Sequence, residues 1–321
     1  MGDGKWELCT DDDSSDHHHS GMVKIHILPS RILESIAGGA GDNDLPAAAN
    51  VYSPVNELSA LEMIANHNTL GDDEKLPKHV VGSKLIATSS QDVYAILPYH
   101  QDGTLLQFCQ TVGNLPESLA RCLFRQIVQV RRSTNFLTGL KTLQDTGLCH
   151  RNISLDAIGL DKDHVDICQL GWALRFNKNA PVDEDRPLPP PGGLDPHCIA
   201  PEYFGSVRGV WNGFSADLWA TGLMLFSMVV GTGALFTAPI AEDKSFHRMC
   251  IRGDIRGQAS RYGKLAGKDF SGLSDELFDL LRNMLRADPK QRLSLEQVME
   301  HPWLTKEELM TPTEWNEGHQ S

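Results

Sequence analysis

The chain has 321 residues and a formal net charge of −13, from 29 Lys and Arg against 42 Asp and Glu. This length fits one large domain or two coupled lobes. A hydrophobic content of 40% is enough for a core, which excludes a wholly disordered chain. The acidic balance argues against a nucleic-acid partner, because binding to a phosphate backbone requires a basic surface that releases counterions.

Cysteine usage and the first residues bear on the cellular compartment. Seven cysteines are scattered without a C-x-x-C pair, so the sequence predicts neither a zinc site nor a disulfide framework and favours a reducing compartment. Asp11, Asp12 and Asp13 stand where a signal peptide would carry its apolar run. We therefore expect a soluble intracellular protein, cytoplasmic or nuclear.

In chain order, the predicted elements begin with strands. Residues 22–28 and 93–97 are mostly apolar and rich in residue types that favour strands. Residues 56–65 carry apolar side chains at helical spacing, with Asn56 as the expected cap. Residues 37–50 are rich in Gly, Ala and Asp and are predicted to be a flexible insertion.

After residue 103 the pattern is mostly helical. Helices are predicted over residues 119–143, 277–285 and 295–299. Residues 179–196 are rich in Pro, Gly and Asp, which predicts an exposed loop. A strand-rich front followed by a helix-rich back predicts an α+β protein with two lobes.

Residues 218–241 contain no charged side chain and are long enough to span a bilayer. The stretch also contains Gly222 and Pro239, and Asp217 stands immediately before it. A buried core helix followed by a glycine-containing turn is the favoured interpretation, so no membrane contact is expected. A membrane anchor is the weaker alternative.

Short motifs follow one another in the back half of the chain. H-R-N occupies residues 150–152, C-Q-L-G occupies 168–171, and A-P-E occupies 200–202. Their order resembles the H-R-D, D-F-G and A-P-E motifs of protein kinases. The resemblance extends to the core helix that starts near residue 215 and to the closing segments 285–292 and 301–304. The chain is thus similar to serine/threonine kinases over nearly its whole length, which implies a bilobal kinase-like fold.

Two structural contacts are implied by the same resemblance. In the family, the aspartate at the start of the core helix braces the catalytic loop, and Asp217 stands at that position. Glu202 and Arg292 match the buried pair that ties the substrate loop to the large lobe.

The front half adds weaker matches. Gly2 and Gly4 resemble the start of a glycine-rich phosphate loop in which the third glycine is replaced by glutamate. Lys24, within M-V-K-I, resembles the kinase lysine that contacts phosphates, and the resemblance implies a pairing with Glu57 on the next helix.

Further expectations concern the adenine pocket and the boundaries of the lobes. Leu97 falls at the back of the adenine pocket of the family, and Tyr99 lies in the hinge that follows. The resemblance divides the chain into a β-rich lobe, in which the first strand of the family is expected to be missing, a helical lobe and a tail. These parts cover residues 1–98, 99–304 and 305–321.

The residue types differ from the family where the chemistry takes place. Asn152 stands at the position of the catalytic aspartate, and its amide cannot accept a proton as a carboxylate does. Ala157 and Gln169 stand at the two metal-ligand positions, although Mg²⁺ prefers carboxylate and phosphate oxygens. The resemblance therefore implies that ATP can bind while Mg²⁺ is poorly held.

Two interpretations follow from these differences. The favoured one is a pseudokinase, a scaffold or allosteric module for a protein partner that is not identified by the sequence. The alternative is an active serine/threonine kinase that uses unusual ligands, such as Gln169 together with Asp156. His150 is expected to pack beneath the loop, and Arg151 has no phosphate to meet, because residues 172–202 contain no Ser, Thr or Tyr.

Overall fold

The computed structural model describes residues 5–9, 21–26, 56–57, 59–61, 63–64, 85–88, 93–98, 100–128, 139–175, 199–204, 212–231, 235–307 and 309–319. For the strands before residue 99 this description covers the backbone. Gly2, Gly4 and Tyr99 lie outside the described residues, as do the predicted loops 37–50 and 179–196.

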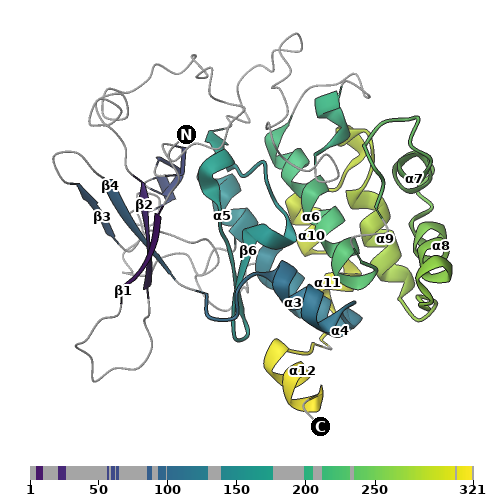
Figure 1. Ribbon diagram of the computed structural model, residues 1–321. Coiled ribbons are helices and arrows are strands. Elements are labelled where there is room, and N and C mark those ends of the chain that lie inside the picture. Colours follow the sequence, from purple (N-terminus) through teal and green to yellow (C-terminus); the bar gives the residue numbers. More distant parts are fainter. Residues whose placement is uncertain are drawn as a thin grey trace.

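The N-terminal part is a four-stranded antiparallel sheet with the strand order β1-β2-β4-β3. Its strands are β1 (Lys5–Cys9), β2 (Gly21–His26), β3 (Leu85–Thr88) and β4 (Val93–Pro98). Lys24 of β2 pairs with Ala95 of β4 and with Trp6 of β1, which places the lysine in the middle of the sheet. Figure 1 shows this sheet on one side of the molecule and the helices on the other.

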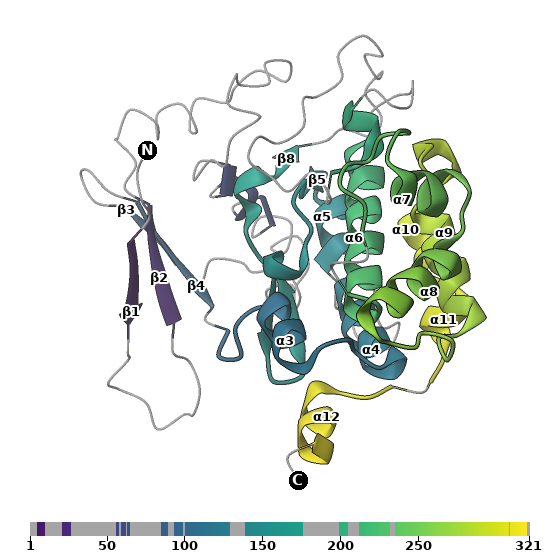
Figure 2. The ribbon, with the colours of Figure 1, turned by 45° about the vertical axis from the view of Figure 1, so that its right-hand side comes forward.

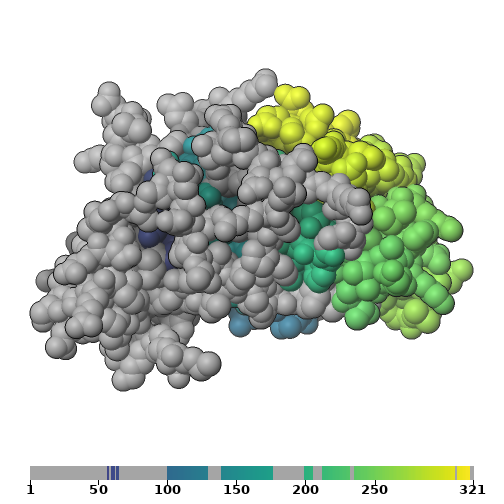
Figure 3. All heavy atoms as spheres, turned by 90° about the horizontal axis from the view of Figure 1, so that it is seen from above, coloured from purple at the N-terminus to yellow at the C-terminus, as the bar shows by residue number. Residues whose placement is uncertain are grey.

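Helices dominate the rest of the chain (Figure 2). They are α3 (Leu105–Val112), α4 (Glu117–Val128), α5 (Gly139–Asp145), α6 (Gly213–Val229), α7 (Lys244–Phe246), α8 (Ile255–Ala266), α9 (Asp275–Met284), α10 (Leu295–Met299), α11 (Pro302–Thr305) and α12 (Pro312–His319). Seen from above, the segments from α7 onward lie together at one end of the molecule (Figure 3).

Two short antiparallel sheets of two strands each lie between the four-stranded sheet and the helices. They are formed by β5 (Leu148–Cys149) with β8 (Leu174–Arg175), and by β6 (Ile158–Asp161) with β7 (His164–Ile167). A single turn of 3-10 helix, Leu155–Ala157, lies between β5 and the hairpin of β6 and β7. The segment 150–157 is therefore held between paired strands at both of its ends.

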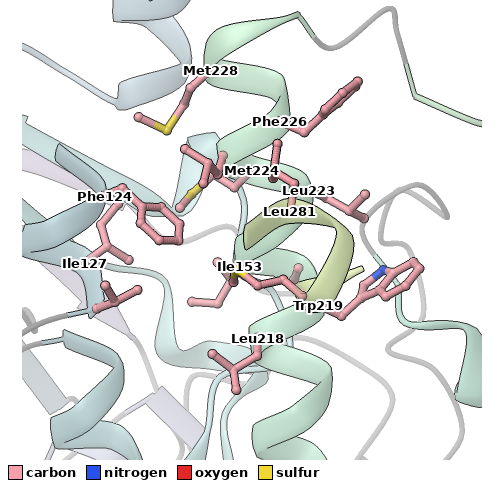
Figure 4. Packing of buried hydrophobic residues seen from close by; sticks show 14 of the residues in the cluster. Phe124, Ile127, Ile153, Leu218, Trp219, Leu223, Met224, Phe226, Met228 and Leu281 are labelled. Carbon is pink, nitrogen blue, oxygen red and sulfur yellow. The ribbon is translucent and has the colours of Figure 1, made fainter. Parts of the chain in front are cut away.

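Helix α6 is the centre of the core. Asn212 caps it by accepting a hydrogen bond from the Ser215 backbone nitrogen at 3.0 Å. In Figure 4, Met224 and Met228 point toward Phe124 of α4, whereas Trp219 points the opposite way. Because nearly every residue of α6 is buried, its apolar character reflects contact with protein on all sides.

The uncharged stretch 218–241 is thus a core helix that ends at Val229, followed by turns, as the favoured interpretation predicted. Within the described parts of the chain, no helix has both the length and the hydropathy that a bilayer crossing needs.

Other predicted elements agree with the structure except at their boundaries. Residues 56 and 57 are both helical, so Asn56 belongs to its helix and does not precede it. The strand predicted over 22–28 is Gly21–His26, and the helices predicted near the end are α9 and α10. The long helix predicted over 119–143 is described only at its two ends, as α4 and α5.

Candidate functional site

The loop after β5 is held from below by α6. Asp217 is 3% exposed, and its two carboxylate oxygens accept hydrogen bonds from the backbone nitrogens of His150 and Arg151, each at 2.7 Å. Arg151 has a φ of 67°, which non-glycine residues rarely adopt, and the two bonds hold it there. Burial raises the pKa of Asp217 to about 7, although the two backbone bonds and the Arg151 charge act in the opposite direction.

His150 packs beneath this loop with no exposed surface, which confirms the sequence expectation. Burial lowers its pKa to about 4, so the imidazole is neutral at pH 7. The backbone nitrogen of Asn152 donates to Nδ1 at 3.2 Å, so the proton must sit on Nε2, 2.7 Å from the carbonyl oxygen of Cys168. The ring thus acts as a buried bridge between the two motif segments.

The positions of Ala157 and Gln169 are brought together. The Cys168 backbone nitrogen donates to the Ala157 carbonyl oxygen at 2.8 Å, next to Gln169. The Gln169 side-chain nitrogen lies 3.0 Å from the Asp156 carbonyl oxygen and 3.2 Å from its carboxylate. Asn152 is half-buried. Its backbone nitrogen donates to the His150 imidazole, which contacts the carbonyl oxygen of Cys168, the residue before Gln169.

The residues at this centre do not fit a magnesium site. Ala157 is buried and has no ligand atom, and Gln169, whose side-chain nitrogen donates to Asp156, offers a metal ion only a neutral amide oxygen. The exposed carboxylate of Asp156 is the acidic group in contact with Gln169. The described residues include no group of three or more His, Cys, Asp or Glu side chains placed to hold a metal ion.

Glu57 lies close to this centre. It is 4% exposed, and its charge opposes the lowering of the His150 pKa that burial causes. The predicted pairing of Glu57 with Lys24 stays a prediction, because the side chain of Lys24 lies outside the described residues. Leu97 lies on β4, where its backbone pairs with Met22 of β2.

The segment after β4 is fastened to the β6–β7 hairpin. Nε2 of His100 lies 3.0 Å from the Asp166 carboxylate, and its ring covers Gly159 so closely that a Cβ there would lie 2.6 Å from it. Since His100 and Asp166 are 66 residues apart, sequence spacing carried no signal for this contact.

Tyr203 lies near Arg151, and Arg292 contacts Glu202, the last residue of the A-P-E segment. Burial raises the pKa of Tyr203, and the nearby charge of Arg151 opposes that rise. Arg292 donates to both carboxylate oxygens of Glu202, at 2.7 and 2.5 Å, and its guanidinium lies 4.8 Å from the ring centroid of Trp219. The expected Glu202–Arg292 pair is therefore present and buried.

Comparisons with known proteins agree with this arrangement. The family model of the protein kinase domain matches residues 66–304, well over half of the chain, and Lys24 and Glu57 precede the match. The serine/threonine-protein kinase PLK4 of Drosophila grimshawi is 30% identical over 220 residues, which cover 67% of this chain and 24% of that protein.

Two further relatives are more distant. The serine/threonine-protein kinase SRK2F of Arabidopsis thaliana is 26% identical over 254 residues, covering 78% of this chain and 63% of that protein. GIN4 of Saccharomyces cerevisiae, also a serine/threonine-protein kinase, is 28% identical over 219 residues, covering 68% of this chain and 17% of that protein. The chain thus spans about a quarter or less of the fly and yeast proteins. It belongs to the protein kinase domain family.

Proposed function

We propose that this chain is a catalytically impaired protein kinase domain, a pseudokinase, which binds a protein partner as a scaffold or allosteric module. ATP is held weakly and without Mg²⁺. One observation carries the proposal: the base position and both metal-ligand positions hold uncharged side chains, Asn152, Ala157 and Gln169.

Proton transfer is the first chemical step affected. A positioned general base contributes roughly 10²- to 10⁴-fold to a rate. The amide of Asn152 cannot take a proton, and His150 cannot replace it, because its ring is buried and both of its nitrogens are engaged. This supports a severe loss of any transfer to a protein hydroxyl.

Charge stabilisation is the second step affected, and it is usually the largest contribution to catalysis. Phosphoryl transfer depends on metal ions that neutralise the charge developing on the phosphates. Ala157 offers no ligand atom, and Gln169 offers a neutral amide whose nitrogen already bonds to Asp156. The missing carboxylates support metal-independent nucleotide binding in place of transfer.

The framework around the loop is preserved although the chemistry is not. Asp217 still braces the loop, and the Glu202–Arg292 pair still fastens the segment that follows. Buried polar groups of this kind are costly unless all of them are paired. Their retention supports a role that needs the folded surface, such as binding a partner.

An active kinase with unusual ligands is the second candidate. The observation that favours it is the exposed carboxylate of Asp156, which lies beside Gln169 and forms no ion pair within the described part of the chain. If this carboxylate holds a metal ion, transfer must depend on the metal and on Asp156.

The test uses the full chain and combines binding with transfer. Thermal unfolding is measured with ATP, with and without Mg²⁺ or Mn²⁺, next to the transfer of labelled phosphate to generic protein substrates. ATP at 100 times its Kd stabilises the native state by about 2.7 kcal/mol. We expect a metal-independent shift and no transfer. Metal-dependent transfer that is lost in both Lys24→Met and Asp156→Asn would overturn the proposal, and Glu300→Gln, at an exposed acidic residue, serves as the matched control.

A further inference from the structure

The segment that connects α7 to α8 lies at the end of the molecule remote from the sheet (Figures 1 and 2). Its side chains line a hollow that is rich in basic residues. Its volume is about 320 Å³. Four of its lining residues are basic and two are acidic: Lys244, His247, Arg248 and Arg252, with Glu242 and Asp254. We call this site the basic hollow. Cavities that hold small ligands begin at about 300 Å³.

The backbone concentrates positive charge in the basic hollow. Lys244, Arg248 and Arg252 follow one another at intervals of four residues, and like charges at this spacing on a helix destabilise it. The helix widens to a π-helix over His247–Ile251, where the backbone nitrogen of Arg252 donates to the His247 carbonyl oxygen at 2.9 Å. Turns of this kind occur often at functional sites.

Two of the acidic groups nearby, Asp254 and Asp243, accept hydrogen bonds from the backbone. Asp254 accepts a hydrogen bond from the Gly257 backbone nitrogen at 2.9 Å and caps α8. Asp243 accepts from three backbone nitrogens, at 2.8 to 3.0 Å, and these bonds outweigh burial and lower its pKa. These carboxylates stabilise helix starts and do not pair with the neighbouring cations.

The basic side chains have no such partners. Among the described residues, none of Lys244, His247, Arg248 and Arg252 has a side-chain hydrogen bond or an ion pair with another residue. With three Lys and Arg side chains against two carboxylates, the basic hollow is positive in a chain whose formal net charge is −13. An anion bound there would relieve the repulsion among the cations.

Phosphate monoesters fit this chemistry best. Arginine forks bind phosphate oxygens through paired, charge-assisted hydrogen bonds, and two arginines with a lysine can surround one such group. We propose that the basic hollow binds a phosphorylated serine or threonine side chain of a protein partner. The inference stands on residues far from the kinase motifs and does not depend on whether the chain transfers phosphate.

A peptide fits the site better than a membrane. The basic hollow is concave and large enough to admit a phosphorylated side chain, whereas a bilayer presents a flat anionic surface that would repel a chain of this net charge. Ile251 is 47% exposed beside Arg252, where it offers an apolar contact to the residues that flank a phosphorylated side chain. Glu242, which also lines the basic hollow, disfavours a ligand with several consecutive anionic groups.

The test uses a pool of fluorescein-labelled peptides of degenerate sequence, each with a phosphoserine at its centre. Fluorescence anisotropy measures the binding of this pool to the full chain. The comparison is the same pool with serine. The variant Arg248→Gln/Arg252→Gln removes two charges from the basic hollow. The variant Arg261→Gln/Lys264→Gln removes two charges from the exposed face of α8 and is the matched control.

We expect the phosphorylated pool to bind, the unphosphorylated pool to bind at least about tenfold more weakly, and the hollow variant to lose at least about tenfold in affinity. The α8 control should bind as the unchanged chain does. Equal binding of both pools, equal losses in the two variants, or no binding of the phosphorylated pool would overturn the proposal. Sedimentation with phosphatidylserine vesicles in the absence of phosphopeptide binding would overturn it in favour of a lipid surface.

Discussion

The side-chain amide of Gln169 donates to both the carbonyl oxygen and the carboxylate of Asp156, at 3.0 and 3.2 Å. The amide of Gln169 is neutral. It contacts the carboxylate of Asp156, whose oxygens would otherwise be the best ligands for a metal ion near the loop. Gln169 adopts a φ of 62°, so the backbone holds a strained conformation at the same place. The contact therefore links the two motif segments without a metal ion.

The first prediction concerns Gln169→Asp. Aspartate tolerates the left-handed conformation better than glutamine, and the new carboxylate would lie beside Asp156 and repel it. Mg²⁺ should then stabilise this variant, by about 1.4 kcal/mol at ten times its Kd, and leave the unchanged chain unaffected. Thermal unfolding with and without Mg²⁺ measures the difference. Gln169→Leu is the control, and an equal response in all three proteins would contradict the prediction.

The second prediction concerns pH. The pKa of His150 is about 4 in the folded chain, below its ordinary value of 6.5, so its contribution to stability is present above pH 6.5 and is lost on acidification. The pKa of Asp217 is about 7, above its ordinary value of 3.8, so its contribution is present below pH 3.8 and is lost as the pH rises. Between pH 4 and 6.5 the two slopes oppose each other.

Replacing Asp217 by Asn should therefore expose the slope of His150. We expect the free energy of unfolding of Asp217→Asn to fall more steeply than that of the unchanged chain between pH 6.5 and 4, by up to about 1.4 kcal/mol per pH unit. Urea titrations across this range measure the slopes, and His150→Gln should change them in the opposite sense. If the free energy of unfolding varied with pH in the same way in all three proteins, the pKa shifts of His150 and Asp217 would be contradicted.

The third prediction concerns the buried ion pair. The side chains of Arg292 and Glu202 are 1% and 0% exposed, so removal of the arginine leaves a carboxylate in the core with no counter-charge. Arg292→Met should lower the free energy of unfolding by about 3–5 kcal/mol. The double variant with Glu202→Leu should recover part of that loss, because no charge is then left buried.

Arg256→Met serves as the surface control for this pair. Its partner Asp275 is 95% exposed, and exposed pairs contribute little, so we expect a change below about 1 kcal/mol. Denaturant unfolding of the unchanged chain and the three variants measures the effects. A loss in Arg292→Met no larger than in Arg256→Met would show that the buried pair is not needed.

The fourth prediction concerns the close approach of His100 to Gly159. A methyl group at residue 159 would lie 2.6 Å from the ring, so Gly159→Ala should displace the ring and lengthen its contact with Asp166. We expect a loss of about 1–3 kcal/mol of stability. His100→Ala in the same chain should remove most of that additional cost, which a double-mutant cycle measures. Additive losses would mean that the ring does not rest on the glycine.

Several features were readable from the sequence because they depend on local order or on side-chain identity. The uncharged stretch after Asp217 predicted a core helix, since a segment without charges can be buried on every side. The residue types at 152, 157 and 169 are chemical facts about single positions. The brace from Asp217 and the Glu202–Arg292 pair followed from the resemblance to the kinase family and are present.

The tertiary structure alone decided which of these groups meet. The bonds from Gln169 to Asp156, the ring of His100 on Gly159 and the basic hollow all depend on side chains brought together by the folded backbone. Contacts between residues far apart in sequence leave no periodic signal in the sequence. The absence of ion pairs among the described residues around the basic hollow likewise became visible only in the structure, although its lysine and arginines are close in sequence. The sequence by itself determined which side-chain types stand at residues 152, 157 and 169, and the fold decided which contacts these residues make.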